Sequence, residues 1–294
     1  ELTIDDGQVT GVKRACHLAE PWFFNQSTRS SPAARINGLQ IETDVALQRA
    51  YEILRESKAP LIYGLSRSST PGQRAAVKLA ERIGATIDTT ASLGHGASVM
   101  AVQTVGESTC TLGEARTRAD LVLYWGTNPA VSHPRHLERY AADPVSEFLP
   151  QGRRSRTVIV LDTHETQTSQ IADQFIRVEP HSDYEVITAL RLLLRNRSLP
   201  SSSAGGVPLA ELQRLSEQLR TCRYGIVFFG FGLSRSPHGH LTVEALLRMV
   251  TDLNSQTRFC ARRMRGSGDE WNSAYKYILS GDSRITPSEI FDAT

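Results

Sequence analysis

The sequence lacks the features that mark several common classes of protein. Only four of its 294 residues are lysine, and none of these four follows a glycine. A P-loop needs a lysine directly after its last glycine to reach the phosphates, so hydrolysis of ATP or GTP by that route is excluded. The four cysteines form no CxxC pair, which argues against a zinc site and against a disulfide framework.

Long apolar runs and a strong net charge are absent as well. The longest apolar stretch, residues 226–233, contains two glycines and is far too short to cross a bilayer. The first residues do not have the pattern of a signal peptide, so we expect a cytoplasmic, reduced protein. The net charge of +2, from 33 basic and 31 acidic residues, gives no electrostatic reason to expect nucleic acid or an anionic membrane as a partner.

Composition and length are those of an ordinary globular protein. Hydrophobic residues make up 40% of the sequence and charged residues 22%, which excludes disordered and collagen-like chains. The length suffices for one large domain or two modest ones.

From about residue 58, short apolar runs alternate with amphipathic stretches. Strands are expected at 61–63, 86–88, 121–125, 157–161, 174–178, 226–229 and 258–264, and helices at 70–83, 182–194, 209–219 and 243–253. This alternation is typical of the α/β class and predicts parallel sheets covered by helices on both faces.

Two helix starts and one connection have recognisable local signals. Thr70 with Gln73, and Ser182 with Glu185, have the spacing of a capping box. Residues 150–154 combine proline, glycine and two arginines. We therefore expect an exposed connection there and divide the chain near residue 150.

Three expected strands are followed by a glycine and a small polar residue, at 64–66, 126–128 and 232–234. Ligands of open parallel sheets bind beyond the carboxyl ends of strands, where glycine lets backbone amides approach a phosphate. With Asp162 at a fourth strand end, the pattern indicates a nucleotide or pterin crevice, while tight turns alone are the competing explanation. A standard NAD site is not expected, because Gly230-x-Gly232 lacks the third glycine of the fingerprint.

The histidines give weaker signals. His133 and His136 flank Arg135, but Pro134 disrupts helical spacing, so we expect this segment to face an anion or a subunit interface rather than a metal. His95 lies between two glycines in an expected loop after the strand at 86–88, where a ligand contact and a plain surface loop are equally compatible. No Ser-His-Asp or Cys-His set can be assigned.

Several strings of residues, in one order along the chain, closely resemble the B subunit of formylmethanofuran dehydrogenase, a member of the molybdopterin oxidoreductase superfamily. The resemblance runs from about residue 5 to residue 268. Its strings lie at 87–92, 110–114, 119–122, 125–129, 133–136, 171–173, 183–184, 243–246, 252–254 and 264–266.

This resemblance implies two Rossmann-like parallel-sheet lobes of the molybdopterin oxidoreductase type, with the iron–sulfur domain reduced or absent. Residues 1–40 would be the remnant of the iron–sulfur segment, 41–150 the first lobe and 151–268 the second lobe. Residues 269–294 show no resemblance and are expected to be a divergent tail. Enzymes of this family reduce carbon dioxide to formate at a tungsten or molybdenum pterin in the B subunit, and a partner subunit condenses the formate with methanofuran.

The sequence departs from the family at its redox positions. Family members place a metal-binding cysteine before the histidine corresponding to His95, where this chain has Gly94. They also hold a [4Fe–4S] cluster with four N-terminal cysteines, the last of which corresponds to Cys16. The other three are either lost or lie upstream of Glu1. The residues that would hold the pterin dinucleotide in metal-bearing relatives are still present: Gly126, Thr127, Asn128, Asp162, Thr166 and Thr168.

Loss of redox residues on an intact scaffold resembles the B subunit of the bacterial formyltransferase/hydrolase complex in tetrahydromethanopterin-linked C1 metabolism. We therefore expect a metal-free structural subunit with no cofactor, in contact with the other subunits of such a complex. One alternative is a redox-active formylmethanofuran dehydrogenase subunit with a molybdenum or tungsten bis-pterin guanine dinucleotide and a [4Fe–4S] cluster. Another is a stand-alone nucleotide-binding protein.

Overall fold

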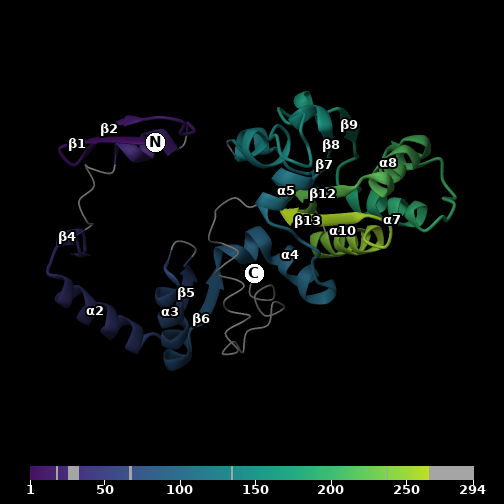
Figure 1. The fold of residues 1–294 in the computed structure, drawn as a ribbon. Helices are drawn as coiled ribbons and strands as arrows, with labels where there is room; N and C mark the ends of the chain where they lie inside the picture. The colour runs from purple at the N-terminus through teal and green to yellow at the C-terminus, as the bar shows by residue number, and fades with distance from the viewer. Residues whose placement is uncertain (18, 26–32, 66–67, 134, 237, 265–294) are drawn as a thin grey trace. The chain divides into compact units, whose positions relative to one another are not determined.

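The computed structural model describes residues 1–264 except 18, 26–32, 66–67, 134 and 237 (Figure 1). The chain divides into two compact units, Glu1–Asp88 and a second unit that begins at Thr89. The expected tail, 269–294, and the last residues of the expected second lobe lie outside the described residues. No helix of the described part is both long enough and apolar enough to span a membrane.

The described residues of the first unit form short strands and three helices. Its hairpin turns at Asp6 and Gly7, both of which have positive φ, as a two-residue hairpin turn requires. In chain order its elements are β1 (Leu2–Asp5), β2 (Gln8–Val12), α1 (Ala19–Phe24), β3 (Arg35–Ile36), β4 (Leu39–Gln40), α2 (Thr43–Glu56), β5 (Leu61–Gly64), α3 (Thr70–Ile83) and β6 (Thr86–Thr89).

The second unit is built around one five-stranded sheet in the order β13-β12-β7-β8-β9, with every neighbouring pair parallel. This confirms the α/β class. The strands of the sheet are β7 (Leu121–Trp125), β8 (Thr157–Asp162), β9 (Gln174–Arg177), β12 (Tyr224–Phe229) and β13 (Arg258–Arg263). The connections contain α4 (Thr90–Val105), α5 (Leu112–Arg118), α6 (Pro129–Ser132), the π-helix η1 (Leu137–Ala141), the 3₁₀ turns η2 (Gly152–Ser155) and η3 (Ser169–Ile171), α7 (Asp183–Leu194), β10 (Ser203–Ala204), β11 (Val207–Pro208), α8 (Leu209–Thr221), α9 (Phe231–Ser234) and α10 (Gly239–Leu253).

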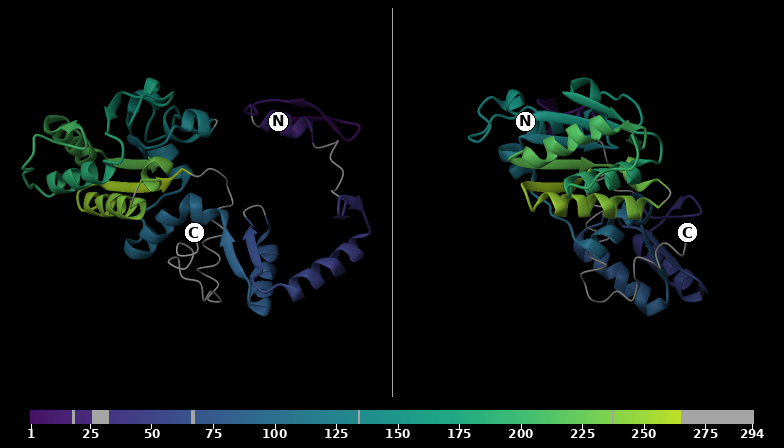
Figure 2. Two further views of the ribbon diagram at one scale, coloured as in Figure 1. Left: turned by 180° about the vertical axis from the view of Figure 1, so that it is seen from behind. Right: turned by 90° about the vertical axis from the view of Figure 1, so that its right-hand side faces the viewer.

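Helices cover both faces of this sheet. On one face, Trp125 and Phe229 pack with side chains of α7, α8 and α10, and α10 lies along the sheet in both views of Figure 2. On the other face, Tyr124 and Phe228 pack with α5 and η1. Every residue of β7 and β12 is buried, which explains why these strands have continuous apolar runs rather than alternating patterns.

The expected domain boundary near residue 150 is wrong. Strand β7 precedes that position and pairs directly with β8, which follows it, so a cut at 150 would divide one sheet. The segment itself is largely exposed, as expected, at Pro150, Gln151 and Arg154, and only Gly152 is buried. Gly152 has φ +57, and a Cβ there would lie 2.7 Å from the Asp143 carbonyl oxygen. Proline and glycine mark an exposed turn within one unit, anchored at Gly152, rather than a linker between two lobes.

The two predicted capping boxes, at the starts of α3 and α7, do not form as expected. Ser69, not Thr70, caps α3, since its hydroxyl accepts a hydrogen bond from the Gly72 amide at 3.3 Å. The Gln73 side chain donates instead to the Leu65 carbonyl at 3.0 Å. Helix α7 forms as expected, but no cap bond from the Ser182 side chain occurs among the described residues.

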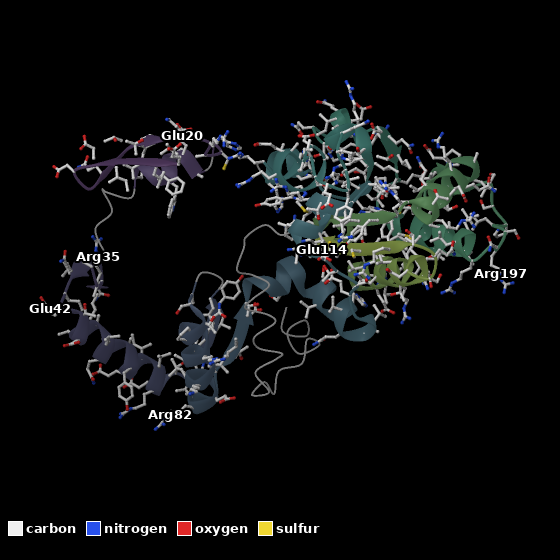
Figure 3. All side chains as sticks on the ribbon, in the orientation of Figure 1. Glu20, Arg35, Glu42, Arg82, Glu114 and Arg197 are labelled. Atoms are coloured by element: carbon white, nitrogen blue, oxygen red, sulfur yellow. The ribbon has the colours of Figure 1, made fainter. Side chains whose placement is uncertain are left out.

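Helix α5 does have a complete capping box. The Thr111 hydroxyl accepts from the Glu114 amide at 3.1 Å, and the Glu114 carboxylate accepts from the Thr111 amide at 2.8 Å. Glu114 is labelled in Figure 3, at the start of this helix. The capping box stabilises the N-terminal end of α5, which covers the face of the sheet that contains Tyr124 and Phe228.

Candidate functional site

The loops after β7 and β12 touch through their backbones at the carboxyl edge of the sheet. The Gly232 amide donates to the Gly126 carbonyl at 3.0 Å, and the Gly230 amide donates to the Trp125 carbonyl at 3.1 Å. A Cβ on Gly232 would lie 2.6 Å from the Gly126 Cα. Glycine is required at these strand ends because two main chains meet there. The Gly126 amide itself donates to the Leu161 carbonyl at 2.9 Å, so it does not point free toward a ligand.

Asn128 joins the loop after β7 to the loop after β8. Its Oδ1 accepts from the Thr168 hydroxyl at 2.8 Å and from the Thr168 amide at 3.2 Å. The Thr168 oxygen accepts in turn from the Ala130 amide at 3.1 Å, and the Asn128 Nδ2 donates to Gln167 Oε1 at 2.7 Å. Thr168 is completely buried. The structure therefore brings two of the expected site residues together and joins them directly to each other.

Asp162 and Thr166 also lie beyond the end of β8. The Asp162 carboxylate accepts from the Thr163 amide at 2.7 Å. Thr166 and Ser169 exchange hydrogen bonds, with the Thr166 amide donating to the Ser169 hydroxyl at 2.8 Å. Thr127 is partly buried, and its Cβ is the atom that a Cβ on Gly230 would approach to 2.6 Å. The expected strand end at 64–66 belongs to the first unit, and its Ser66 lies outside the described residues.

A cavity of about 390 Å³ opens beside the ends of β8 and β9. Two of the residues that line it are joined, because Arg177 Nε donates to the Thr163 carbonyl at 3.1 Å. Its lining residues are Thr163, Arg177, Val178, Glu179, Pro180 and Gly206. Carboxylate, guanidinium and backbone groups in one hollow at the carboxyl edge of a parallel sheet are suited to binding the polar groups of a nucleotide.

Two polar residues at this edge were not expected as site residues. Asp183, at the start of α7, accepts from the Trp125 indole Nε1 at 2.8 Å, and burial, with the nearby Asp162 charge, raises its pKa. Arg263, at the end of β13, is buried and donates to the Ser234 hydroxyl at 2.9 Å. Asp183 lies at the start of a predicted helix and Arg263 near the end of a predicted strand. The sequence does not show that these two positions lie at the same edge, because that depends on the order of the strands in the sheet.

The segment around Gly94, where the resemblance implies a metal-binding cysteine, is helical. Residues 94–96, expected to form a loop, lie within helix α4, so the loop prediction for Gly94 and His95 is wrong. Gly94 has no side chain to ligate an ion. No cluster of three or more His, Cys, Asp or Glu side chains suited to a metal occurs among the described residues.

The cysteines of the described residues are divided between the two units. Cys16 is in the first unit, where its carbonyl accepts from the first amides of α1. Cys110, Cys222 and Cys260 belong to the second unit, and Cys110 and Cys260 are buried in its core.

Replacing Thr168 with Val should lower the free energy of unfolding by about 1–3 kcal/mol, because the change keeps the shape but removes the hydroxyl that accepts from the Ala130 amide and donates to Asn128 Oδ1. Equilibrium urea denaturation measures the difference. Thr221→Val is the control, since the exposed Thr221 hydroxyl bonds only within its own helix turn and its loss should change stability by less than about 0.5 kcal/mol. Equal effects of the two substitutions would contradict a structural role for the Asn128–Thr168 link.

Two curated relatives share substantial sequence with the chain. The B subunit of tungsten-containing formylmethanofuran dehydrogenase 2 from Methanocaldococcus jannaschii is 36% identical over 273 residues, 90% of this chain and 63% of the relative. The protein of the same name from Methanococcus maripaludis is 36% identical over 307 residues, 98% of this chain and 71% of the relative. The chain thus spans about two thirds of the length of these relatives. No protein-family model matches it.

More distant similarities agree with these two. The Fhc B subunit of the formyltransferase/hydrolase complex of Methylorubrum extorquens is 26% identical over 229 residues, 78% of this chain and 58% of that protein. The crystal structure of the formyltransferase/hydrolase complex FhcABCD from the same organism, with methylofuran bound, superposes with a TM-score of 0.66 at 24% identity. That match covers 85% of this chain and 66% of the other.

Acetylene hydratase from Pelobacter acetylenicus superposes with a TM-score of 0.59 at 12% identity, over 77% of this chain and 34% of the other. Structural similarity at these identities shows a shared fold and nothing further. The sequence identity with the two dehydrogenase subunits extends over nearly the whole chain. The chain therefore belongs to the family of formylmethanofuran dehydrogenase B subunits.

Proposed function

We propose that this chain is the B subunit of a formyltransferase/hydrolase complex in tetrahydromethanopterin-linked C1 metabolism and acts there as a metal-free structural subunit. In such a complex other subunits transfer the formyl group to a methanofuran analogue and hydrolyse it to formate. The observation that carries the proposal is Gly94, which stands where the family resemblance implies a metal-binding cysteine. A pterin-bound tungsten or molybdenum would have no thiolate ligand from this position.

The polar groups at the strand ends support a structural role. Asn128, Thr168 and Ala130 satisfy one another, and so do Thr166 and Ser169. These side chains are therefore engaged with one another and would bind a dinucleotide only if these hydrogen bonds opened. In the described structure they join the β7 and β8 loops as a scaffold requires.

The surface of the first unit supports a place among other subunits. Helix α2 buries none of its residues, and Leu47, Tyr51 and Ile53 are each more than half exposed. Exposed apolar side chains in this number mark surfaces that a partner covers. Because obligate subunit interfaces are large and apolar, we assign this surface to contacts within the complex.

Elemental analysis of the complex purified from its native host tests the proposal. We expect molybdenum and tungsten far below one atom per complex while hydrolysis of the formyl group is intact in the same sample. A tungsten-containing dehydrogenase purified by the same route is the control for metal lost during preparation. Stoichiometric molybdenum or tungsten would refute the metal-free role and favour the redox-active alternative.

A second candidate function is nucleotide binding by the isolated chain. The cavity beside Asp162 favours it, because it lies where parallel sheets bind such ligands. The two candidates differ in how the chain behaves alone. A monodisperse single chain that binds GDP tightly would support the second, and a chain that is soluble only with its partners would exclude it.

A further inference from the structure

Two cysteines lie in the same part of the core of the second unit. Cys110, which directly precedes the α5 capping residue Thr111, is 6% exposed, and Cys260, in the middle of β13, is completely buried. Both belong to the cluster on the face of the sheet that contains Tyr124 and Phe228. The two cysteines are about 150 residues apart in the chain, so it is the fold that brings their sulfur atoms together.

Hydrogen bonds hold the segment before α5 alongside β13, the last strand of the described sheet. The Ala261 amide donates to the Ser108 carbonyl at 2.8 Å, and the Arg262 Nη1 donates to the Cys110 carbonyl at 2.6 Å. Both contacts are made by residues that directly follow Cys260. They keep the segment that carries Cys110 next to the strand that carries Cys260.

The two thiols form a cluster with one phenol. The Tyr224 hydroxyl lies 3.5 Å from the Cys260 sulfur atom, within hydrogen-bonding distance for sulfur. A hydrogen bond between the two thiols lowers the pKa of Cys260 to about 6, and the same bond, with burial, raises the pKa of Cys110. The cluster therefore stabilises a thiolate, which is the form of cysteine that reacts with oxidants.

We propose that Cys110 and Cys260 are an oxidisable pair, which a peroxide converts to a disulfide bond. A disulfide needs Cα atoms about 4–7 Å apart. Segments that lie side by side in the manner of neighbouring strands are about 5 Å apart, so this pair can be joined without rearranging the sheet. The proposal rests on the core of the second unit and does not depend on the proposed function.

The reaction consumes one molecule of hydrogen peroxide for each pair. The thiolate of Cys110 attacks one peroxide oxygen, the O–O bond breaks, and a sulfenic acid forms while the other oxygen leaves as hydroxide. The Cys260 sulfur then attacks the sulfenic sulfur, the S–OH bond breaks, and the S–S bond forms. The two thiol protons end on the two departing oxygens, so both sulfur atoms are oxidised and the peroxide is reduced to two waters. Cys110 reacts first because it retains exposure to a small oxidant, whereas Cys260 has none.

The disulfide would join the start of α5 covalently to the edge strand β13. A cross-link that closes a long loop stabilises a protein mainly by restricting its unfolded chain. The loop between Cys110 and Cys260 contains most of the main sheet, because β7, β8, β9 and β12 all lie within it. We therefore expect the oxidised chain to unfold at a higher urea concentration than the reduced chain.

Peptide mapping of the full chain tests the proposal. The folded chain is incubated with a small excess of hydrogen peroxide, then unfolded in the presence of an alkylating reagent and digested for mass spectrometry. We expect one pair of linked peptides, which contain Cys110 and Cys260, while Cys16 and Cys222 are recovered as alkylated thiols. Dithiothreitol should release the linked peptides and return the midpoint of urea denaturation to its value before oxidation.

Cys222 supplies the matched control. It is a half-buried cysteine of the same unit, but it packs on the opposite face of the sheet, where its sulfur lies 3.8 Å from the Thr257 hydroxyl. Cys222→Ser should form the same linked peptides, and Cys260→Ser should form none. The unaltered chain decides the question even if Cys260→Ser does not fold. Recovery of both Cys110 and Cys260 as thiols, oxidation of Cys110 without a link, or a preferred link to Cys222 would overturn the proposal.

Discussion

Replacing Arg156 with Met is expected to lower the free energy of unfolding by about 3–5 kcal/mol. The Arg156 side chain is 4% exposed and lies beneath the end of α5. Its guanidinium donates to the carbonyls of Ala115, Arg116 and Ala119, and to the Pro144 carbonyl at 3.1 Å. Methionine would fill most of the volume and leave four carbonyls, most of them buried, without this donor.

The last carbonyls of a helix lack amide partners further along the helix, and Arg156 supplies a donor to those of Arg116 and Ala119 at the end of α5. Arg156→Lys should retain part of the stability, because an ammonium has the charge but not the planar fork that reaches several oxygens. Arg154→Ala is the matched control, since Arg154 is exposed and should change stability by less than about 0.5 kcal/mol.

Equilibrium urea denaturation of the full chain, followed by circular dichroism, measures these differences. Equal midpoints for the Arg156→Met and Arg154→Ala variants would show that the guanidinium does not hold the end of α5. A loss confined to Arg156 would explain why a charged residue is buried one position before the start of β8.

The strands of the main sheet could be predicted from the sequence because burial on both faces requires continuous apolar runs. The runs at 121–125 and 226–229 became β7 and β12, the central strands with complete burial. The end of helix α3 could also be predicted, because Gly84 readily adopts the left-handed conformation that ends the helix. Such signals are local, and local signals are what a single sequence contains.

Helix α4 could not be predicted in this way. Its first half contains Gly94 and Gly96, and each glycine disfavours a helix by about 1 kcal/mol relative to alanine. The segment packs against α10, which lies about 150 residues later in the chain, and this contact outweighs the local preference. The expectation of a flexible loop followed from the glycines alone.

The site shows the same division between local and distant information. The strand ends at Gly126 and Asp162 were found because strands end where the apolar runs end. The bonds between Asn128 and Thr168, which are forty residues apart, and the contact of Gly126 with Gly232 depend on the order of strands in the sheet. No spacing along the chain encodes that order, and the same uncertainty allowed a boundary at residue 150 through the middle of the sheet.

Replacing Gly232 with Ala should lower the free energy of unfolding by about 2–4 kcal/mol. The added Cβ would lie 2.6 Å from the Gly126 Cα and 2.9 Å from the Gly126 carbonyl oxygen, so one of two main chains must move. Movement would break the hydrogen bond from the Gly232 amide to the Gly126 carbonyl. It would also displace Asn128, two residues further along the same loop.

Gly113→Ala is the control for the general effect of adding a methyl group to glycine. Gly113 lies in the first turn of α5, and its nearest neighbour, the Thr111 hydroxyl oxygen, would be 3.5 Å from the new Cβ. Alanine favours the helix, so this variant should be as stable as the original chain or up to about 1 kcal/mol more stable. Denaturation of the two variants side by side separates close contact from backbone entropy.

If Gly232→Ala destabilises the chain and Gly113→Ala does not, the glycines at the carboxyl edge are explained by the contact of two main chains. Such glycines would persist in a subunit that has lost its metal ligand, because the fold itself requires them. If Gly232→Ala is tolerated, packing does not account for this glycine. Close approach of a ligand would then be the remaining reason for it, and the cavity beside Asp162 would become the first place to look for a bound nucleotide.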